Sequence, residues 1–519
     1  SAVTPPSYKY SIRPLFTFKT LIKLKIFIFM IPVWILRILV MACWSKTQKV
    51  IFPGHGKFNQ FVLLTCGLIM LNVSMESVGM SYVITAAECE LGLTSEHKGL
   101  VNAAAFIGII ATSFLWGYLG DRCGRRAVML PALVASAVFS IASSFATNVW
   151  MLLFLRMLTG CLISASSATV YAYLGEMHIS SKRAAAIAWG SVFISFSFII
   201  LPGFAWMIIP GKWSFSLFGF RIIPWRAFVW SWCAPGLLAA AALLILPESP
   251  RYLLVAGGPE KALPVLATMH QWNHGAGEKF PVEKIKTSSD TSQKGGFVGA
   301  MKNFRLLFQA PLLRCVIISH VSMFAVFMLT VCAKWLMMII FSVKTDDSIF
   351  IFQLISSRCQ SEVSVAVYPI SMSMGVVFAI TYLAIGVFID RIGRKNLYSG
   401  IMVVCGIATI AAALIPHGIA ATALLILALC AGCAASILAA IAVDVFPTSL
   451  RAMAMCTMYM VGRAGAAIGS NFLGTTLDRH CVMAFAVFGV FSAGSTVLMI
   501  FWPKPEKVRE EMEKKGLSY

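Results

Sequence analysis

The chain has 519 residues, of which 59% are hydrophobic and only 12% are charged. A soluble protein of this length needs a more highly charged surface to stay solvated, so the composition excludes a soluble globular protein and places most of the surface against lipid. The formal net charge of +21 would suggest nucleic-acid binding in a soluble protein. Here the basic residues lie mainly in short connections and at the two ends, so they predict membrane orientation and contact with anionic lipid, and no nucleic-acid partner.

A membrane-spanning helix needs about 20 predominantly apolar residues, and the sequence contains twelve such stretches. We expect an all-α membrane protein with core spans at 58–86, 99–119, 127–146, 149–172, 184–209, 226–246, 312–341, 366–388, 397–415, 419–443, 452–474 and 482–502. Residues 26–44 are also apolar and are flanked by lysines. This segment is either a thirteenth span or an interfacial helix, and we favour a surface helix or a non-native extension.

Two features of the sequence recur at nearly one offset. The loop Gly117–Arg126 matches Gly386–Lys395 in its glycines, aspartate and basic residues, 269 positions further on. An acidic residue followed seven positions later by an arginine recurs at an offset of 268, as Glu176 with Arg183 and Asp444 with Arg451. Such a repeat indicates a duplicated unit, so we expect two pseudo-symmetric six-helix bundles.

The connections between spans alternate between basic loops and loops that are poorer in lysine and arginine, which places the basic set in the cytoplasm. The expected organisation is an N-terminal cytoplasmic or interfacial extension at 1–57, bundles at 58–246 and 312–502, a cytoplasmic linker at 247–311 and a cytoplasmic tail at 503–519. The linker contains Gly, Ser, Asp and Lys near 287–296, which is typical of a flexible segment. A short surface helix is expected near 259–270.

Each residue type in the first copy of the repeated loop has a physical role. Gly117 lets two helices approach closely, and Gly124 suits a turn that needs a positive φ. Asp121 can accept hydrogen bonds at a helix N-terminus. The neighbouring arginines, which can pair with carboxylates on other helices, are Arg122, Arg125 and Arg126. The loop predicts a breakable clasp on the cytoplasmic face; the alternative is a basic loop that only sets the orientation of the chain.

These motifs resemble those of a known family. Gly117–Arg126 resembles the signature loop of the major facilitator superfamily between its second and third helices, and Gly386–Lys395 resembles its copy between the eighth and ninth. Pro247–Arg251 resembles the signature of the sugar and organic-ion transporter branches after the sixth span. Asp444–Arg451 resembles their motif after the tenth helix, with aspartate where glutamate is usual. The resemblance extends over residues 58–503.

A closer resemblance is to the synaptic vesicle glycoprotein 2 family, in particular its insect members. The stretches that carry it are Leu115–Gly117, Tyr171–Glu176, Trp225–Arg226, Leu246–Arg251, Phe446–Met455 and Gly462–Gly465. Unlike vertebrate members, the chain has a short predicted external loop at 342–365 and no Asn-x-Ser/Thr in a plausible external loop. A large glycosylated lumenal domain is therefore not implied.

The resemblance also implies gating residues. In sugar-porter relatives, carboxylates and arginines at these cytoplasmic motifs form the inward gate. Carried over by position, the gating residues are Gly117, Asp121, Arg122, Gly124, Arg126, Glu176, Arg183, Glu248 and Arg251 in the first half, and Asp390, Arg394, Asp444 and Arg451 in the second. The implied pairs form in the outward-open state and break in the inward-open state, and they are not expected to touch substrate.

Charged side chains inside spans are costly and indicate function by default. Glu76 is the sole acid well inside the first core span. It either couples transport to protons or to a cation, or is held by an arginine across the bundle. Arg156 and Arg463 either bind an anionic group or hold Glu76, and we favour structural pairing for both. Lys334 lies toward the external end of the seventh span, where we expect it to snorkel.

Cysteines and nucleotide motifs narrow the function further. Cys89, Cys359 and Cys481 fall in predicted external loops, so a disulfide is one alternative, although no spacing supports it. The sequence has no Gly-Lys-Ser/Thr phosphate loop, no arrangement typical of a catalytic nucleophile and no metal-ligand spacing of cysteine with histidine. We therefore expect no enzyme, no ATP-driven transport, no cofactor and no metal.

The expected function is secondary transport by alternating access, with a small organic ion or polar metabolite bound near the bilayer midplane between the halves. Coupling to protons through Glu76 is a hypothesis. The alternative is a transporter-shaped vesicle or membrane protein that acts in trafficking or binding without a transport cycle. A channel is disfavoured because no pore-lining ring of charge is visible. We expect a monomer in the plasma membrane or an intracellular vesicle membrane.

Overall fold

The computed structural model describes residues 56–217, 219–275, 280–282, 305, 307–342, 367–415, 418–446 and 448–503, together with 506, 508, 510 and 511. The chain divides into two units, Ser1–Pro53 and Gly54–Tyr519. All described residues lie in the second unit. The apolar segment 26–44 therefore lies outside the described residues, and its two interpretations stay open.

The first half of this unit is almost entirely helical. Its helices are α3 (Lys57–Val78), α4 (Met80–Leu91), α5 (Ser95–Cys123), α6 (Arg125–Ser143), α7 (Val149–Glu176), α8 (Ser180–Ile208) and α9 (Pro224–Ile245). A short antiparallel hairpin of β1 (Phe215–Leu217) and β2 (Phe220–Ile222) lies between α8 and α9. After α9 come α10 (Pro250–Gly257) and α11 (Pro259–His274), the latter where the sequence predicts a surface helix.

The second half is helical throughout its described residues. Its elements are α13 (Leu312–Ser342), α14 (Val367–Ile392), α15 (Arg394–Leu414), α16 (Gly418–Leu429), the 3₁₀ turn η3 (Cys430–Cys433), α17 (Ala434–Val445) and α18 (Thr448–Ile500). The stretch 419–443, expected as one span, is thus built from α16, η3 and α17. The tighter 3₁₀ turn interrupts the regular hydrogen-bond ladder at the middle of this span.

Helix α18 covers both the eleventh and the twelfth expected spans, 452–474 and 482–502. The rings of Phe472 and Phe488 pack with their centroids 5.8 Å apart, whereas 16 residues of straight helix extend about 24 Å. Phe324 of α13 contacts both ends of this stretch, because its ring packs on Phe491 and its carbonyl lies against Gly465. The chain therefore reverses direction between residues 472 and 488, and α18 forms two antiparallel segments.

Ten helical stretches of the described residues are long and apolar enough to cross a membrane. The expected spans 366–388 and 452–474 are not among them, although both positions are helical wherever they are described. Helix α14 contains a shorter apolar helix at Ser371–Tyr382. Each of the twelve expected spans therefore coincides with helical structure over most of its described residues.

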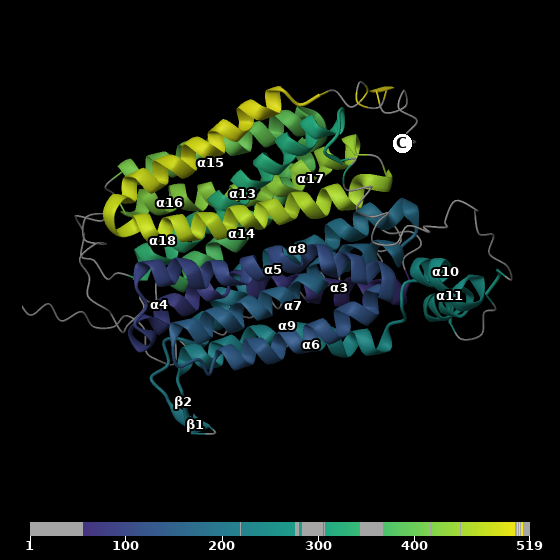
Figure 1. The fold of residues 1–519 in the computed structure, drawn as a ribbon, viewed down its shortest axis with the longest axis horizontal. Helices are drawn as coiled ribbons and strands as arrows, with labels where there is room; N and C mark the ends of the chain where they lie inside the picture. The colour runs from purple at the N-terminus through teal and green to yellow at the C-terminus, as the bar shows by residue number, and fades with distance from the viewer. Residues whose placement is uncertain are drawn as a thin grey trace, which may run out of the picture. The chain divides into compact units, whose positions relative to one another are not determined.

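The helices of the two halves form two groups (Figure 1), and each half has its own hydrophobic core. Buried side chains of α3, α7, α8 and α9 form one core, with Phe58 and Leu243 among its fully buried members. Buried side chains of α13, α15, α17 and α18 form the other, which includes Met323 and Phe446. Two separate cores are what two duplicated bundles require, because each must bury its own apolar faces.

Small residues set the spacing of helices α5 and α7. A Cβ on Gly108 would lie 2.1 Å from the carbonyl oxygen of Met157, and one on Gly160 would lie 2.1 Å from that of Ala105. Glycine allows this backbone contact, which is how helices pack most closely in membranes. Gly117 does not have the role expected of it, since nothing lies within 4 Å of a Cβ built there. The close approach of α5 to α7 lies nearer the start of α5, at Gly108.

The two halves contact each other at the end of the helices remote from the loop Gly117–Arg126. Gly99 of α5 lies against Ser470 and Gly474 of α18. Asn102 Nδ2 donates a hydrogen bond to Ser470 Oγ at 3.1 Å and accepts one from Ser81. Further inward, the rings of Phe198 and Phe378 stack at 4.8 Å. We call this region the inter-half contact; it consists of small, neutral and aromatic groups.

Two matched substitutions test the packing of α5 on α7. Gly160→Ala forces a methyl group into a backbone contact, so we expect it to destabilise the protein by about 1–3 kcal/mol. Gly400→Ala lies in α15 with nothing within 4 Å of its Cβ, so we expect a gain of up to about 1 kcal/mol from helix propensity. The measurement is thermal unfolding of both purified variants in detergent. Equal shifts in the two variants would contradict the close α5–α7 contact.

Candidate functional site

The first span is interrupted next to its buried acid. Helix α3 ends at Val78 and α4 begins at Met80. A Cβ on the intervening Gly79 would lie 2.6 Å from the ring of Trp232, so only glycine fits there. The interruption leaves the Glu76 carbonyl open to a side-chain donor. Arg156 Nη2 donates to that carbonyl at 2.7 Å, as the polar backbone of a broken membrane helix requires.

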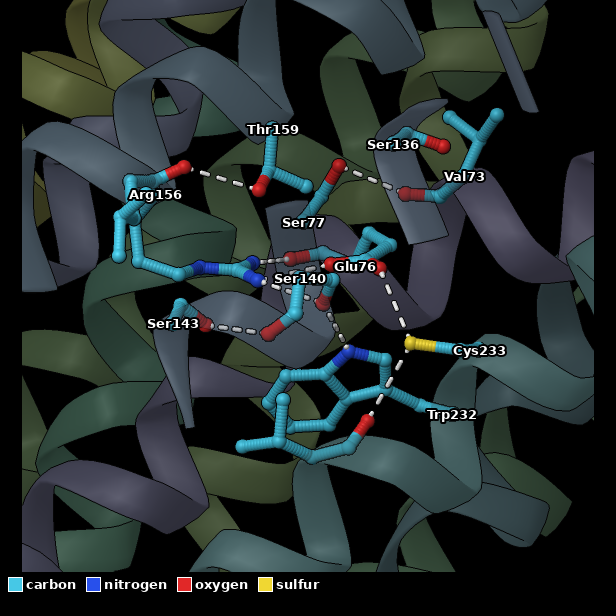
Figure 2. A network of polar contacts seen from close by, with 12 residues as sticks. Val73, Glu76, Ser77, Ser136, Ser140, Ser143, Arg156, Thr159, Trp232 and Cys233 are labelled. Carbon is cyan, nitrogen blue, oxygen red and sulfur yellow. Dashed lines mark hydrogen bonds and ion pairs between the residues drawn. The ribbon is translucent and has the colours of Figure 1, made fainter. Parts of the chain in front are cut away.

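The same arginine holds the Glu76 carboxylate (Figure 2). Arg156 Nη1 lies 2.8 Å from Glu76 Oε2, and the two side chains are 0% and 2% exposed. Nη1 also donates to Ser140 Oγ at 3.2 Å, and the guanidinium lies 5.4 Å from the ring centroid of Trp232. Cys233 Sγ lies 3.9 Å from the other carboxylate oxygen. The charges of Glu76 and Arg156 therefore compensate each other inside the first half.

This geometry decides between the interpretations left open for Glu76. The structure shows the carboxylate held by an arginine across the bundle, and that arginine is Arg156. Arg463 does not hold Glu76. It lies half-buried in α18, within electrostatic range of Tyr171 of α7 and of Tyr459 on its own helix. Roles of these three charges in coupling or substrate binding stay predictions.

At the repeated loop, a carboxylate from a distant segment covers the start of α6. Gly124 adopts φ 105°, a left-handed conformation that other residues rarely adopt, and α6 begins directly after it. Glu248 accepts hydrogen bonds from the backbone N–H groups of Arg125 at 3.0 Å, Arg126 at 3.1 Å and Ala127 at 3.1 Å. The first N–H groups of a helix lack partners within the helix, and its dipole favours a negative charge there.

The expectation that Asp121 caps this helix is therefore wrong. Asp121 belongs to the last turn of α5, and its carboxylate pairs with Arg125 Nη2 at 2.8 Å. Arg125 also reaches Glu176 at the end of α7, with Nε 3.2 Å from Oε2. Ser249 donates a hydrogen bond to the same Glu176 oxygen at 2.5 Å. We call Asp121, Arg125, Glu176, Glu248 and Ser249 the clasp.

Three expected gating residues lie around the clasp without forming its ion pairs. Arg126 donates to the carbonyl oxygens of Leu243 at 2.8 Å and Leu244 at 3.1 Å, at the end of α9. Arg122 donates to the Tyr118 hydroxyl at 2.9 Å, and Arg251 is exposed. Arg125, which the motif placed among three similar arginines, is the one that joins α5, α7 and the segment after α9.

The second copy of the loop is described only in part. Gly393 has φ 86°, as its counterpart in the first half does, and Arg394 Nη1 donates to the Ala440 carbonyl at 3.3 Å. The side chains of the remaining expected gating residues lie outside the described residues: Arg183, Asp390, Asp444 and Arg451. The second clasp therefore stays a prediction.

A further polar cluster, which the sequence did not indicate as a site, lies at the opposite end of the first half. Glu90 accepts hydrogen bonds from Trp225 Nε1 at 2.6 Å and Arg226 Nη2 at 2.9 Å. Arg226 also donates to the carbonyl of Ala146 at 3.1 Å. The adjacent pair Trp225–Arg226 at the start of a span was the sequence signal from which this cluster could have been predicted.

Cys89, next to Glu90 in sequence, is disulfide-bonded. Of the other cysteines considered for a disulfide, Cys359 and the side chain of Cys481 lie outside the described residues.

Lys334 does not snorkel. Its side chain is 3% exposed and lies over the rings of Tyr82 and Phe198, which belong to the other half. The expectation was wrong because depth along a span, which the sequence gives, does not say which face of the helix a side chain occupies.

Among the described residues, no group of three His, Cys, Asp or Glu side chains could hold a metal ion.

Residues 62–470 and 316–517 match the model of the Major Facilitator Superfamily. The chain belongs to this superfamily. It is also similar to synaptic vesicle glycoprotein 2A of Rattus norvegicus and of Homo sapiens, each 33% identical over 240 residues, which is 45% of this chain and 32% of the relative. Synaptic vesicle glycoprotein 2C of Homo sapiens is 32% identical over 240 residues, which is 45% of this chain and 33% of that relative. The alignments thus span about a third of these relatives' length. They confirm the resemblance to that family, while its insect form is not tested.

Solved structures agree on the fold. The xylose transporter XylE from E. coli, in a partially occluded inward-open conformation, has a TM-score of 0.63 and 16% identity, over 86% of this chain and 100% of that chain. A D-xylose-proton symporter has a TM-score of 0.62 and 16% identity, over 86% and 98%. At this identity the likeness shows the fold alone. The all-α major facilitator fold is confirmed, and the chain is an integral multi-pass membrane protein.

The buried ion pair has a testable energetic signature. Arg156→Met leaves the Glu76 carboxylate buried without its partner, so we expect a loss of about 3–5 kcal/mol in stability. Adding Glu76→Gln removes the isolated charge and should recover much of that loss. The measurement is thermal unfolding of the two single variants and the double variant in detergent. A double variant less stable than Arg156→Met would contradict the pairing.

Proposed function

We propose that this protein moves a small organic ion or polar metabolite across a membrane by alternating access. The observation that carries the proposal is the one-sided closure between the halves. At the inter-half contact, Gly99 lies against Gly474 with only backbone and small groups between the helices. Toward the clasp, Tyr171 retains 36% exposure and Cys456 is exposed, although both lie within electrostatic range of the interior Arg463. This pattern fits two bundles that rock about a central site.

The clasp supports the same proposal. Its ion pairs join α5, α6 and α7, and hydrogen bonds of Glu248 and Ser249 add the segment after α9. We therefore expect this half to move as a unit. Asp121 is largely exposed, and exposed pairs contribute only about 0–1 kcal/mol each. Pairs of that strength can bias two states separated by a few kcal/mol without locking either. With the basic loops in the cytoplasm, as their charge predicts, the described arrangement corresponds to an inward-facing state. The clasp of the first half is intact in this arrangement, so the expectation that its pairs break in the inward-open state does not hold for these pairs.

Uptake by reconstituted liposomes tests transport itself. Purified protein in liposomes should accumulate at least one member of a metabolite panel above protein-free liposomes, with saturation at high concentration. A metabolite-wide thermal-shift screen selects the members of that panel. The rival function, a transporter-shaped binding or trafficking protein, predicts thermal shifts with no uptake. That result would refute the proposal.

Labelling of Cys456 tests the one-sided opening. A membrane-impermeant maleimide should label Cys456 when it is applied from the clasp side and should fail from the other side. Cys123, which is exposed in the repeated loop itself, is the positive control for access to that side. Peptide mass spectrometry identifies the labelled residue. Labelling of Cys456 only from the opposite side would contradict the proposed state.

The hypothesis of proton coupling through Glu76 needs Arg156 to release the carboxylate once in each cycle. Glu76→Gln should then flatten the pH dependence of uptake. Burial lowers the pKa of His178, which lies outside the spanning helices, below its ordinary 6.5. Even an unshifted histidine is about 90% neutral one pH unit above 6.5, so uptake compared between about pH 7.5 and 8.5 keeps the contribution of His178 small. Unchanged pH dependence in Glu76→Gln means that the hypothesis is wrong.

A further inference from the structure

Lys334 is a buried cation with no counter-charge among the described residues. Its side chain is 3% exposed, and Nζ has no hydrogen-bond partner among the described residues. The ammonium lies 5.2 Å from the ring centroid of Tyr82 in α4 and 5.1 Å from that of Phe198 in α8. Lys334 belongs to the second half and both rings belong to the first. The charge therefore lies where the two halves meet.

The surroundings compensate this charge only in part. Ring faces attract a cation through their quadrupole, but two neutral rings return less than the ammonium loses on leaving water. The described acids of the first span and its outer end are already engaged. Glu76 pairs with Arg156, Glu88 with Lys98 and Glu90 with Arg226. Among the described residues, no acid is therefore left to neutralise Lys334, and its desolvated ammonium can pair with an anion from outside the chain.

A second buried donor lies within electrostatic range of Tyr82. The hydroxyl of Tyr368 in α14 has no hydrogen-bond partner among the described residues, and the side chain is 1% exposed. Tyr368 is within electrostatic range of Tyr82, and Tyr82 is hydrogen-bonded to Ser371, one turn after Tyr368. Lys334 and Tyr368 thus both lie near Tyr82, and an ammonium and a hydroxyl are donors that can each bind one oxygen of a carboxylate.

The apolar side of this region is aromatic. Phe198, which lies over Lys334, stacks on Phe378 with centroids 4.8 Å apart and an interplanar angle of 18°. Phe378 in turn packs on Tyr382 at 6.5 Å. Such a row of rings favours a flat aromatic body, because offset stacking adds to simple burial. Apolar walls with a few converging polar groups are typical of ligand sites.

We propose that Lys334, Tyr368, Tyr82 and Phe198 form a binding site for a small aromatic monocarboxylate. The carboxylate lies against Lys334 Nζ and the Tyr368 hydroxyl, and the aromatic body lies against the phenylalanine rings. The ligand neutralises a charge of the second half while it contacts rings of the first, so it stabilises the approach of the two halves. The identification of this ligand as the transported substrate rests on the proposed function, whereas the proposal that the ligand binds does not.

The test uses three probes of one shape and different charge. Benzoate, benzamide and benzylamine are added to the purified full chain in detergent, and thermal unfolding is followed. We expect benzoate to raise Tm by about 2 °C or more at saturation, and the neutral and cationic probes to leave Tm unchanged. Equal shifts with benzamide or benzylamine, or no shift with any probe, would overturn the proposal.

Matched variants assign the effect to Lys334. Lys334→Met should abolish the benzoate shift and raise the Tm of the ligand-free protein, because it removes an uncompensated buried charge. Lys98→Met removes the same charge from an ion pair outside the site and should keep the benzoate shift. If Lys334→Met fails to fold, Tyr368→Phe serves instead, with an expected weakening of benzoate affinity of about tenfold. A benzoate shift retained in full by Lys334→Met, or by Tyr368→Phe, would overturn the proposal.

The experiments can refute the binding site and the transport function independently of each other. Lys334-dependent benzoate binding without uptake by liposomes would preserve the site and refute the transporter. Saturable uptake of other metabolites, with no benzoate shift, would preserve the transporter and refute the aromatic monocarboxylate site.

Discussion

The first half is organised around the buried pair of Glu76 and Arg156. One arginine satisfies both the carboxylate and the main-chain carbonyl of the same residue. This double contact fixes α7 against α3 at the point where the first span is interrupted. It also satisfies the carbonyl that the interruption exposes, which would otherwise be costly in lipid. The interruption makes α4 a separate helix, and α4 carries Tyr82 to the ammonium of Lys334. A single ion pair thus links the fold of the first span to the contact between the halves.

The ion pairs whose two side chains are both described lie within the first half. They extend from Glu76–Arg156 in its core to Arg125–Glu176 in the clasp. The inter-half contact consists instead of apposed glycines, the hydrogen bond from Asn102 to Ser470 and stacked rings. Separating these neutral groups exposes no charge of their own, whereas the ammonium of Lys334, which lies against Phe198 across the same boundary, is a charge that parting of the halves would expose. The described ion pairs then keep the first half rigid while it moves.

The sequence predicted those features of the fold that depend on residues close together in the chain. Apolar length predicted the helices, and the repeated loop predicted the positive φ of Gly124. The cap of α6 could not be predicted, because Glu248 lies more than 120 residues after the N–H groups it accepts from, whereas Asp121 is adjacent in sequence but belongs to the preceding helix. The same limit applies to Lys334: its depth was readable, but its partners come from two helices of the other half. The ion pair of Glu76 was only one of two interpretations, because the sequence separation of Glu76 and Arg156 does not show that the two residues face each other across the bundle.

The duplication separates what the fold requires from what this protein adds. At the 268-residue offset of the repeat, the position of Arg156 corresponds to Leu424, which packs against the second core. The first and seventh expected spans begin 254 residues apart, so the position of Lys334 corresponds to Met80, which is buried. A six-helix bundle therefore folds with apolar residues at both places. Because buried charge is costly unless it is compensated, packing alone does not explain Arg156 or Lys334. The repeated loops are common to both halves, so the interior charges, present in only one half each, are the part of the molecule able to distinguish one ligand from another.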